Sequence, residues 1–343
     1  MTVLGPIPTE ELGITLMHEH LLLDATTWWH RPIEPARLSL GEAPVSCTIY
    51  GELRMDPFVN LDNCRLDDVD AAIAEAQQFF ALGGRTIVDT TCRGIGRDPR
   101  ALQKIAEATG LHIVMGTGFY LEPAHPAQVR TMSPDAVAEV IAADVLDGVD
   151  GARAGIIGEI GVSAAFTAEE EKVLRGAARA QRATRVPLTI HLPGWERHGH
   201  RLLDVVGEEG GILNRVILDH MNPSLNDPDY QMSLADRGAY LEYDMIGMDY
   251  FYADQQAQSP CDEENARALR RLINHGYVNQ LLLSQDVFLK MMLTRHGGFG
   301  YGYILRHFVP RLGRHGVTSA QIETMLVANP RRVFTANSED EVI

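Results

Sequence analysis

The 343-residue sequence is poor in cysteine and has no long apolar run. Its four cysteines lie far apart with no C-x-x-C spacing, which argues against a disulfide framework or a thiolate zinc site and is typical of a reducing cytosol. No apolar stretch approaches the ~20 residues that a membrane-spanning helix needs. The first residues contain no charged segment followed by an apolar one, so we expect no signal peptide and a cytoplasmic protein.

Basic charge is also scarce. The chain has 46 acidic residues against 30 basic ones, which gives a formal net charge of -16. Such a surface repels nucleic acid and anionic membranes, so neither is expected as a partner. With 45% hydrophobic and 22% charged residues the composition is that of a soluble enzyme, and we expect a small-molecule substrate.

What the sequence contains is an alternation of short β-type apolar runs with amphipathic helical stretches. The predicted strands are Ile14–Leu21, Thr86–Thr91, His112–Thr117, Ala154–Ile160, Pro187–Leu192, Arg215–His220, Ala239–Asp244 and Gln280–Asp286. The predicted helices are Leu66–Leu82, Arg100–Ala108, Pro134–Leu146, Ala168–Thr184, His198–Gly207, Asp227–Asp236, Glu263–Asn274 and Ser319–Ala328. Ser133 and Thr167 precede two of these helices as N-cap residues.

Eight strand–helix units predict an α/β protein, a (β/α)8 TIM barrel. We expect one domain over residues 1–343, with a long loop insert at about 25–63 after the first strand. The main alternative is a doubly wound open sheet. A dinucleotide-binding sheet of that kind needs G-x-G-x-x-G after the first strand, and this strand ends in His18-Glu19-His20 instead.

Ligand-type side chains recur at the carboxyl ends of the predicted strands. On a strand, His18 and His20 point to one side and Glu19 to the other. The complete set is His18, His20, Glu159, His191, His220 and Asp286. A lone histidine at a strand end is more often structural, but six such residues at five strand ends favour a metal site. By contrast, His198 and His200 repeat the H-x-H spacing on a helix, where they would be splayed about 200° apart.

Active-site groups of such barrels lie at the carboxyl ends of the strands, so these six residues can hold two divalent cations, with Glu159 as the bridge. The cations are expected to be Zn²⁺, with Mn²⁺ or Co²⁺ as alternatives. They lower the pKa of a shared water and polarise a substrate oxygen, and Asp286 accepts the proton as the catalytic residue. The predicted reaction is hydrolysis.

The sequence resembles the phosphotriesterase-related branch of the amidohydrolase superfamily over nearly its whole length. The matching segments are Gly13–His20, Ile87–Asp89, Gly94–Asp98, Gly116–Tyr120, Gly155–Gly161, Gly238–Asp244 and Asn329–Pro330. The resemblance implies a binuclear, usually zinc-containing barrel of the metallo-dependent hydrolase type, and a homodimer. It also implies that His18 and His20 bind one metal, that His191 and His220 bind the other, and that Asp286 lies beside the first.

The sequence departs from that family in two places. Phosphotriesterases and many related lactonases bridge their metals with a carboxylated lysine on the fourth strand, where this chain has Glu159, as some phosphotriesterase-homology proteins do. The histidine–aspartate relay of the organophosphate-hydrolysing enzymes has no counterpart around Met245 or Met221-Asn222-Pro223. Both departures argue against efficient phosphotriesterase activity, which is expected at most as a weak promiscuous reaction.

Candidate pocket residues come from the loops after the strands. They are Trp28, Tyr120, Trp195, Tyr243 and Arg295. Arg295 would pair with an anionic group of the substrate, or else lie solvated in its loop. The glycine-rich segment 297–302 would hold phosphate or, as we favour, only form tight turns.

The predicted function is therefore a metal-dependent hydrolase of a carboxylic ester or lactone, with or without an anionic substituent. An N-acyl amide hydrolase, acting on an N-acyl amino acid or amino sulfonate, is the close alternative, because segments 118–120, 241–244 and 297–301 look like the animal-type phosphotriesterase-related proteins. A binding protein that has lost catalysis is a third possibility. The six-residue set argues against it, since structural zinc sites close with four ligands.

Overall fold

A computed structural model of the chain describes residues 1–335, and within that range eight parallel strands form one sheet. The strands are β1 (Ile14–Glu19), β4 (Gly84–Asp89), β5 (His112–Thr117), β6 (Ile156–Gly161), β7 (Leu188–His191), β8 (Val216–Leu218), β9 (Tyr240–Tyr243) and β12 (Leu281–Leu283). They pair in chain order, and β12 lies against β1, so the sheet curls into a nearly closed cylinder. The prediction of a (β/α)8 barrel is confirmed.

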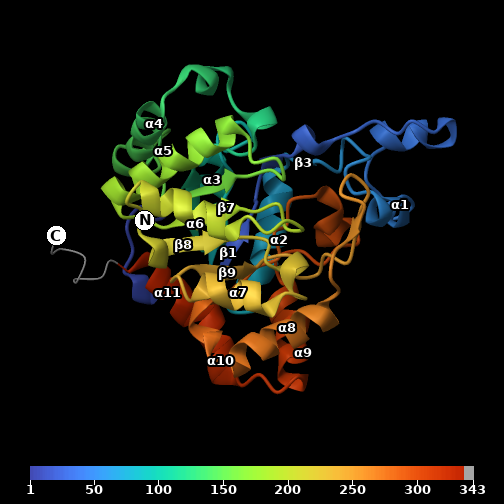
Figure 1. Cartoon of the computed structure of the whole chain (residues 1–343). Helices are drawn as coiled ribbons and strands as arrows, with labels where there is room; N and C mark the ends of the chain where they lie inside the picture. Colours follow the sequence, from blue (N-terminus) through green and yellow to red (C-terminus); the bar gives the residue numbers. More distant parts are fainter. Residues whose placement is uncertain (336–343) are drawn as a thin grey trace.

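Helices surround the strands (Figure 1). They are α2 (Val69–Ala81), α3 (Pro99–Thr109), α4 (Pro134–Leu146), α5 (Ala168–Thr184), α6 (Gly199–Glu208), α7 (Pro228–Ala235), α8 (Asp262–Asn274), α9 (Val309–Arg314), α10 (Ser319–Glu323) and α11 (Asn329–Phe334). The predicted caps are present, because the side chains of Ser133 and Thr167 accept hydrogen bonds from backbone N–H groups of α4 and α5. The sequence prediction missed the helical stretch 304–314, where Pro310 occupies the first turn of α9.

Apolar side chains fill the cylinder below the strand ends. Seven strands contribute to one buried cluster of Met17, Val88, Val114, Ile156, Ile217, Tyr240 and Leu282, and Val333 of α11 joins it. Such a packed interior makes the cylinder a core rather than a pore, so a ligand can enter only at the carboxyl ends of the strands. No helix among residues 1–335 has the length and apolar character to cross a membrane.

The predicted insert follows the carboxyl end of β1. A two-stranded ribbon of β2 (Leu23–Asp24) and β3 (Arg65–Leu66) closes its base, and it contains a 3-10 helix (Pro35–Glu42) and α1 (Tyr50–Met55). Figure 1 shows this segment projecting to one side of the barrel. A second ribbon, β10 (Phe251–Tyr252) with β11 (Ala257–Gln258), is tied to α1 because Arg54 donates a 2.7 Å hydrogen bond to the Asp249 carbonyl.

Candidate metal centre

The end of β1 places two histidines on one side. Leu16 of β1 pairs with Ile87 of β4, and the next pair is Glu19 with Asp89. In this interval β1 has one residue more than β4, so β1 contains a β-bulge. The backbone N–H of His18 donates a 2.8 Å hydrogen bond to Ser284 Oγ of the neighbouring strand end. Glu19 faces away from the two imidazoles, as predicted, and accepts 2.8 Å hydrogen bonds from the backbone N–H groups of Gln285 and Val287. These bonds attach the loop that carries Asp286 to β1.

His20 stands between the two carboxylates of the predicted site. Its Nδ1 lies 2.9 Å from Thr91 Oγ1, a contact that sets the orientation of the ring. Its Nε2 lies 3.3 Å from Glu159 Oε1 and 3.3 Å from Asp286 Oδ1. The hydroxyl contact on one ring nitrogen therefore leaves the other facing both acidic groups, as expected for a metal-binding imidazole.

Glu159 lies at the centre of the four predicted imidazole ligands. Its Oε1 faces His20, and its Oε2 lies 2.9 Å from His191 Nδ1, 3.7 Å from His18 Nε2 and 3.9 Å from His220 Nε2. One oxygen thus faces His20 and the other faces the remaining three imidazoles. This is the placement that a bridging carboxylate requires, and the bridge itself stays a prediction.

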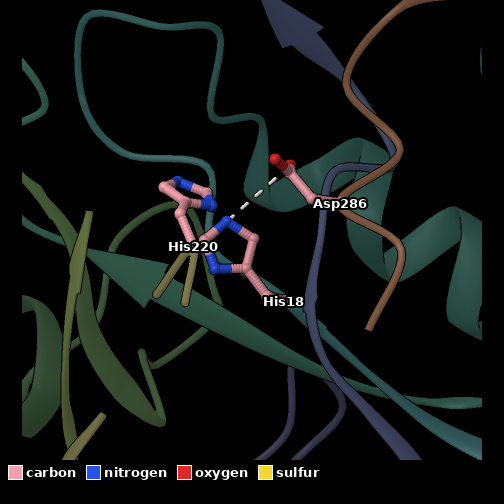
Figure 2. A group of neighbouring side chains, drawn as sticks. All are labelled: His18, His220 and Asp286. Atoms are coloured by element: carbon pink, nitrogen blue, oxygen red, sulfur yellow. Dashed lines mark ion pairs between the residues drawn. The ribbon is translucent and has the colours of Figure 1, made fainter. Parts of the chain in front are cut away.

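His220 and Asp286 lie beyond the ends of β8 and β12, in loops rather than on the strands where the sequence prediction had them. Both adopt the left-handed backbone region, with φ of 56° and 48°, which non-glycine residues rarely occupy. Such backbone strain clusters at functional sites. The side chains of His18, His220 and Asp286 point toward one another, and Asp286 Oδ1 lies 3.8 Å from His18 Nε2 (Figure 2).

Together, the six predicted ligands form three overlapping groups. Within each group, the candidate ligand atoms lie within 4.8 Å of one another. The groups are His18, His220 and Asp286; His18, His20 and Glu159; and Glu159, His191 and His220. Residues far apart in the sequence therefore meet at one point, as the reading of the strand ends predicted.

A second acidic cluster, which the sequence reasoning missed, lies behind His18. Asp219, Glu242 and Asp244 are fully buried and group with His18 Nδ1. Asp244 accepts hydrogen bonds from the backbone N–H of His220, and its Oδ1 lies 3.1 Å from His220 Nδ1. The signal in the sequence that could have revealed this cluster was the presence of carboxylates in predicted strands that are otherwise apolar. Asp244, which does not line the cavity, thus holds His220 in position from behind.

The charges of the site strongly favour a cation. Burial opposes the charged form of His20, but Asp286 and Glu159 outweigh it and raise the pKa of His20 to about 10. For His220, Asp244 likewise outweighs burial and raises the pKa to about 9. The histidines in turn hold the pKa of the Glu159 carboxyl well below its usual range, against the effect of burial. The buried carboxylates thus create a negative potential that a divalent cation matches.

The unsatisfied polar atoms fit a metal in the same place. Within residues 1–335, His18 Nε2 and Asp286 Oδ1, which face one another across the site, are buried without a hydrogen-bond partner. Buried polar atoms without partners are rare and need an explanation, such as an ion. Imidazole nitrogens with carboxylate oxygens are ligands that zinc and related divalent metals accept. The chemistry of the donor set and its unpaired atoms therefore agree.

Five of the six predicted ligands, all but His18, form the floor of a cavity of about 320 Å³. Trp28, Tyr120 and Trp195 line it, as predicted. The Trp28 indole N–H donates a 3.2 Å hydrogen bond to the Tyr120 hydroxyl, which lies 3.4 Å from His191 Nδ1. The sequence reasoning missed Phe58, because its approach to the barrel depends on the path of the insert.

Two predicted pocket residues lie elsewhere. Tyr243 is wholly buried on the outer side of β9, where its hydroxyl donates a 2.6 Å hydrogen bond to Gln231 of α7. Arg295 forms an ion pair with Asp68, the N-cap residue of α2, at 3.1 Å. The prediction that these two side chains line the pocket is wrong, since strand alternation turns one outward and an acidic partner holds the other.

The glycine-rich segment after β12 serves tight turns, as we favoured. Gly297 and Gly300 have φ of 98° and 59°. A Cβ at Gly298 would lie 2.2 Å from the Met292 carbonyl oxygen, so only glycine fits this approach. The Tyr301 hydroxyl then reaches back to the His20 carbonyl with a 2.6 Å hydrogen bond, which fixes the segment against β1.

A barrel with a cluster of metal-binding side chains at the carboxyl ends of its strands defines the class of metal-dependent hydrolases. The model of the phosphotriesterase family matches residues 1–334, and the chain belongs to this family. It is 35% identical over 341 residues to an N-acetyltaurine hydrolase from Xenopus tropicalis, covering 97% of each chain.

Two solved structures resemble the whole fold. A resiniferatoxin-binding protein from Rhodobacter sphaeroides is 60% identical with a TM-score of 0.96, covering 97% of this chain and 94% of that one. A lactonase from Listeria monocytogenes is 25% identical with a TM-score of 0.80, covering 98% and 99%. The names of these relatives thus describe an amide hydrolase, a lactonase and a protein that binds resiniferatoxin.

Proposed function

We propose that the chain is a binuclear metal-dependent hydrolase that cleaves carboxylic esters, lactones included. The observation that carries the proposal is the convergence of four imidazoles and two carboxylates, all of which except His18 line one cavity. When bound, two divalent cations, Zn²⁺ in our proposal, would lower the pKa of water and polarise the substrate carbonyl. His18 and His20 would hold one, His191 and His220 the other, with Glu159 between them.

The remaining chemistry belongs to residues of the chain. Asp286 lies 3.3 Å from His20 and has an oxygen without a hydrogen-bond partner among residues 1–335, so it can accept the proton of an attacking water. Burial keeps the Tyr120 hydroxyl protonated by raising its pKa, and this hydroxyl faces the same floor. The aromatic side chains above the floor exclude bulk water and strengthen these interactions.

Hydrolysis of an N-acyl amide is the second candidate. It is favoured by curated relatives of 31–35% identity, named N-acetyltaurine hydrolase, that the chain matches over 97% of its length. The same site residues could act on the carbonyl group of an ester or on that of an amide. Comparing kcat/KM for a lactone, an aryl ester and an N-acetyl amine on one metal-loaded preparation separates the two.

A binding protein without turnover is a third candidate, in view of the solved relative described as resiniferatoxin-binding. Measuring the metal content and the rate of ester hydrolysis together distinguishes this candidate from the enzyme. About two metal ions per chain with ester turnover support the enzyme, and one or none without turnover supports the binder. The homodimer and the cytoplasmic location stay predictions.

The test of the mechanism uses two variants of the site. Asp286→Asn should lower kcat by about 10²–10⁴-fold while most of the metal is retained, because a proton acceptor is lost. Glu159→Gln should remove at least one metal ion per chain. Asp229→Asn, at an exposed acid in α7, is the control and should change neither quantity. Wild-type turnover in Asp286→Asn, or wild-type metal content in Glu159→Gln, would refute the assigned roles.

A further inference from the structure

We propose that the cavity selects substrates whose distal group is uncharged and apolar and rejects anionic ones, such as the amides of amino sulfonates. This inference rests on the hydrolase function proposed above and names the substrate class of the same site. It departs from the sequence prediction, in which Arg295 left room for an anionic substituent.

The wall above the metal floor is a continuous set of aromatic rings. Trp28 stacks on Phe58 with ring centroids 5.5 Å apart and an angle of 17° between planes. Phe58 also contacts Phe288 at 6.1 Å and Tyr252 at 5.9 Å, and Tyr252 contacts Trp195 at 5.4 Å. These rings come from the insert, from the loops after β7 and β12 and from β10. A ligand group that enters here meets apolar surface.

The aromatic wall offers an anion no arginine or lysine among the described residues. Of the described residues that line the cavity, none is an arginine or a lysine. Glu159 and Asp286 belong to the floor, and the remaining acid is Asp254, in the exposed turn between β10 and β11. Asp254 accepts a 2.8 Å hydrogen bond from the side chain of its neighbour Gln255. An anion at the mouth would therefore meet a carboxylate and no counter-charge.

Three arginines on adjoining segments are already paired. Arg54 of α1 donates to the carbonyl and carboxylate of Asp249, and Arg197, just after the β7 loop tryptophan, pairs with Asp227 at 3.3 Å. Arg295 pairs with Asp68. To serve an anionic ligand, any of them must leave its partner and move into the cavity.

The consequence follows from the geometry of an acylated amino sulfonate. Its sulfonate lies several bonds from the reacting carbonyl, so when the carbonyl is at the floor the sulfonate lies against the aromatic wall. An ion taken out of water without a partner is strongly disfavoured, whereas an apolar group of the same size gains by leaving water. Charge, rather than size, is thus the feature by which the cavity discriminates.

The experiment compares two aryl acetates that differ in one charge, 4-(methylsulfonyl)phenyl acetate and 4-acetoxybenzenesulfonate. Each kcat/KM for the metal-loaded protein is divided by the rate of hydrolysis by hydroxide. We expect a preference of about 100-fold for the uncharged ester, since an unpaired charge on the wall must be desolvated. Equal rates, or faster cleavage of the sulfonate, would overturn the proposal and leave the hydrolase function intact.

Binding of inert analogues makes the result independent of turnover. Methyl phenyl sulfone and benzenesulfonate are titrated while the fluorescence of the wall tryptophans Trp28 and Trp195 is followed. Tighter binding of the sulfone supports the selectivity even if neither ester is cleaved, in which case the hydrolase proposal alone fails. Tighter or equal binding of the sulfonate contradicts the selectivity whatever the turnover.

A pair of variants tests whether the lining itself carries the effect. Gln255→Arg adds a cation to an exposed lining residue, and Gln256→Arg adds the same charge to its exposed neighbour, which does not line the cavity. We expect Gln255→Arg to narrow the preference for the uncharged ester about tenfold, with a much smaller change in Gln256→Arg. No change in Gln255→Arg, or an equal change in both, would overturn the proposal.

Discussion

Replacing Asp144 with Asn should strongly destabilise the barrel. Asp144 of α4 is 2% exposed and accepts hydrogen bonds from Arg93 Nε and Nη2, Arg97 Nη1 and Thr117 Oγ1, at 2.5–3.1 Å. It thereby joins α4 to the loop after β4 and to the end of β5. Burial opposes its charge, but the arginines outweigh this and hold the pKa of the Asp144 carboxyl below its usual range.

The magnitude follows from what the variant leaves unpaired. An asparagine offers one acceptor oxygen and turns an amide N–H₂ toward the guanidinium groups. The Arg97 side chain is only 5% exposed, so water cannot replace the lost carboxylate, whereas Arg93, at 33%, is partly screened. Removing one partner of a buried ion pair costs about 3–5 kcal/mol, and we expect a loss near the lower end.

The assay is urea unfolding of the metal-loaded protein at pH 7 and at successively lower pH. Because the folded pKa of Asp144 lies below the unfolded value of 3.8, its stabilisation is present above pH 3.8 and is lost as the pH falls through the folded pKa. The difference from wild type should therefore shrink only below about pH 4. Asp147→Asn, an exposed acid just after α4, is the control, with a change within about 0.5 kcal/mol. The reasoning would be refuted if Asp144→Asn lost less than about 1 kcal/mol of unfolding free energy at pH 7, or if its difference from wild type did not change with pH.

Two further predictions concern the metal centre. Asp244→Asn should weaken metal affinity about 10–100-fold, measured by competition with a chelator, because His220 loses the charged partner of its Nδ1; unchanged affinity would remove the orienting role of Asp244. Removing the metal with a chelator should lower the midpoint temperature of thermal unfolding, and adding Zn²⁺ back should restore it. The reason is that a ligand present at 100 times its Kd adds about 2.7 kcal/mol to the stability of the folded state. A midpoint that does not change on chelation would contradict a resident metal.

The barrel and the set of six candidate ligands were predictable because both depend on local pattern. Parallel strands bring their carboxyl ends to one edge, so His18, His20 and Glu159 could be grouped before any contact was known. The period of two along a strand also placed Glu19 opposite its neighbouring histidines. His220 and Asp286 were grouped correctly although their positions in loops, with unusual backbone angles, were not foreseen.

Sequence by itself determined the architecture and the convergence of the metal-binding side chains, since these follow from strand order and side-chain alternation. Only the tertiary structure decided what surrounds them. Tyr243 faces α7 and Arg295 pairs with Asp68, while Phe58 reaches the cavity from a distant insert. The packing of loops and helices on the barrel settles such contacts, and no local pattern encodes it. For the same reason the absence of a cation from the described cavity wall, on which the proposed selectivity depends, could not be read from the chain.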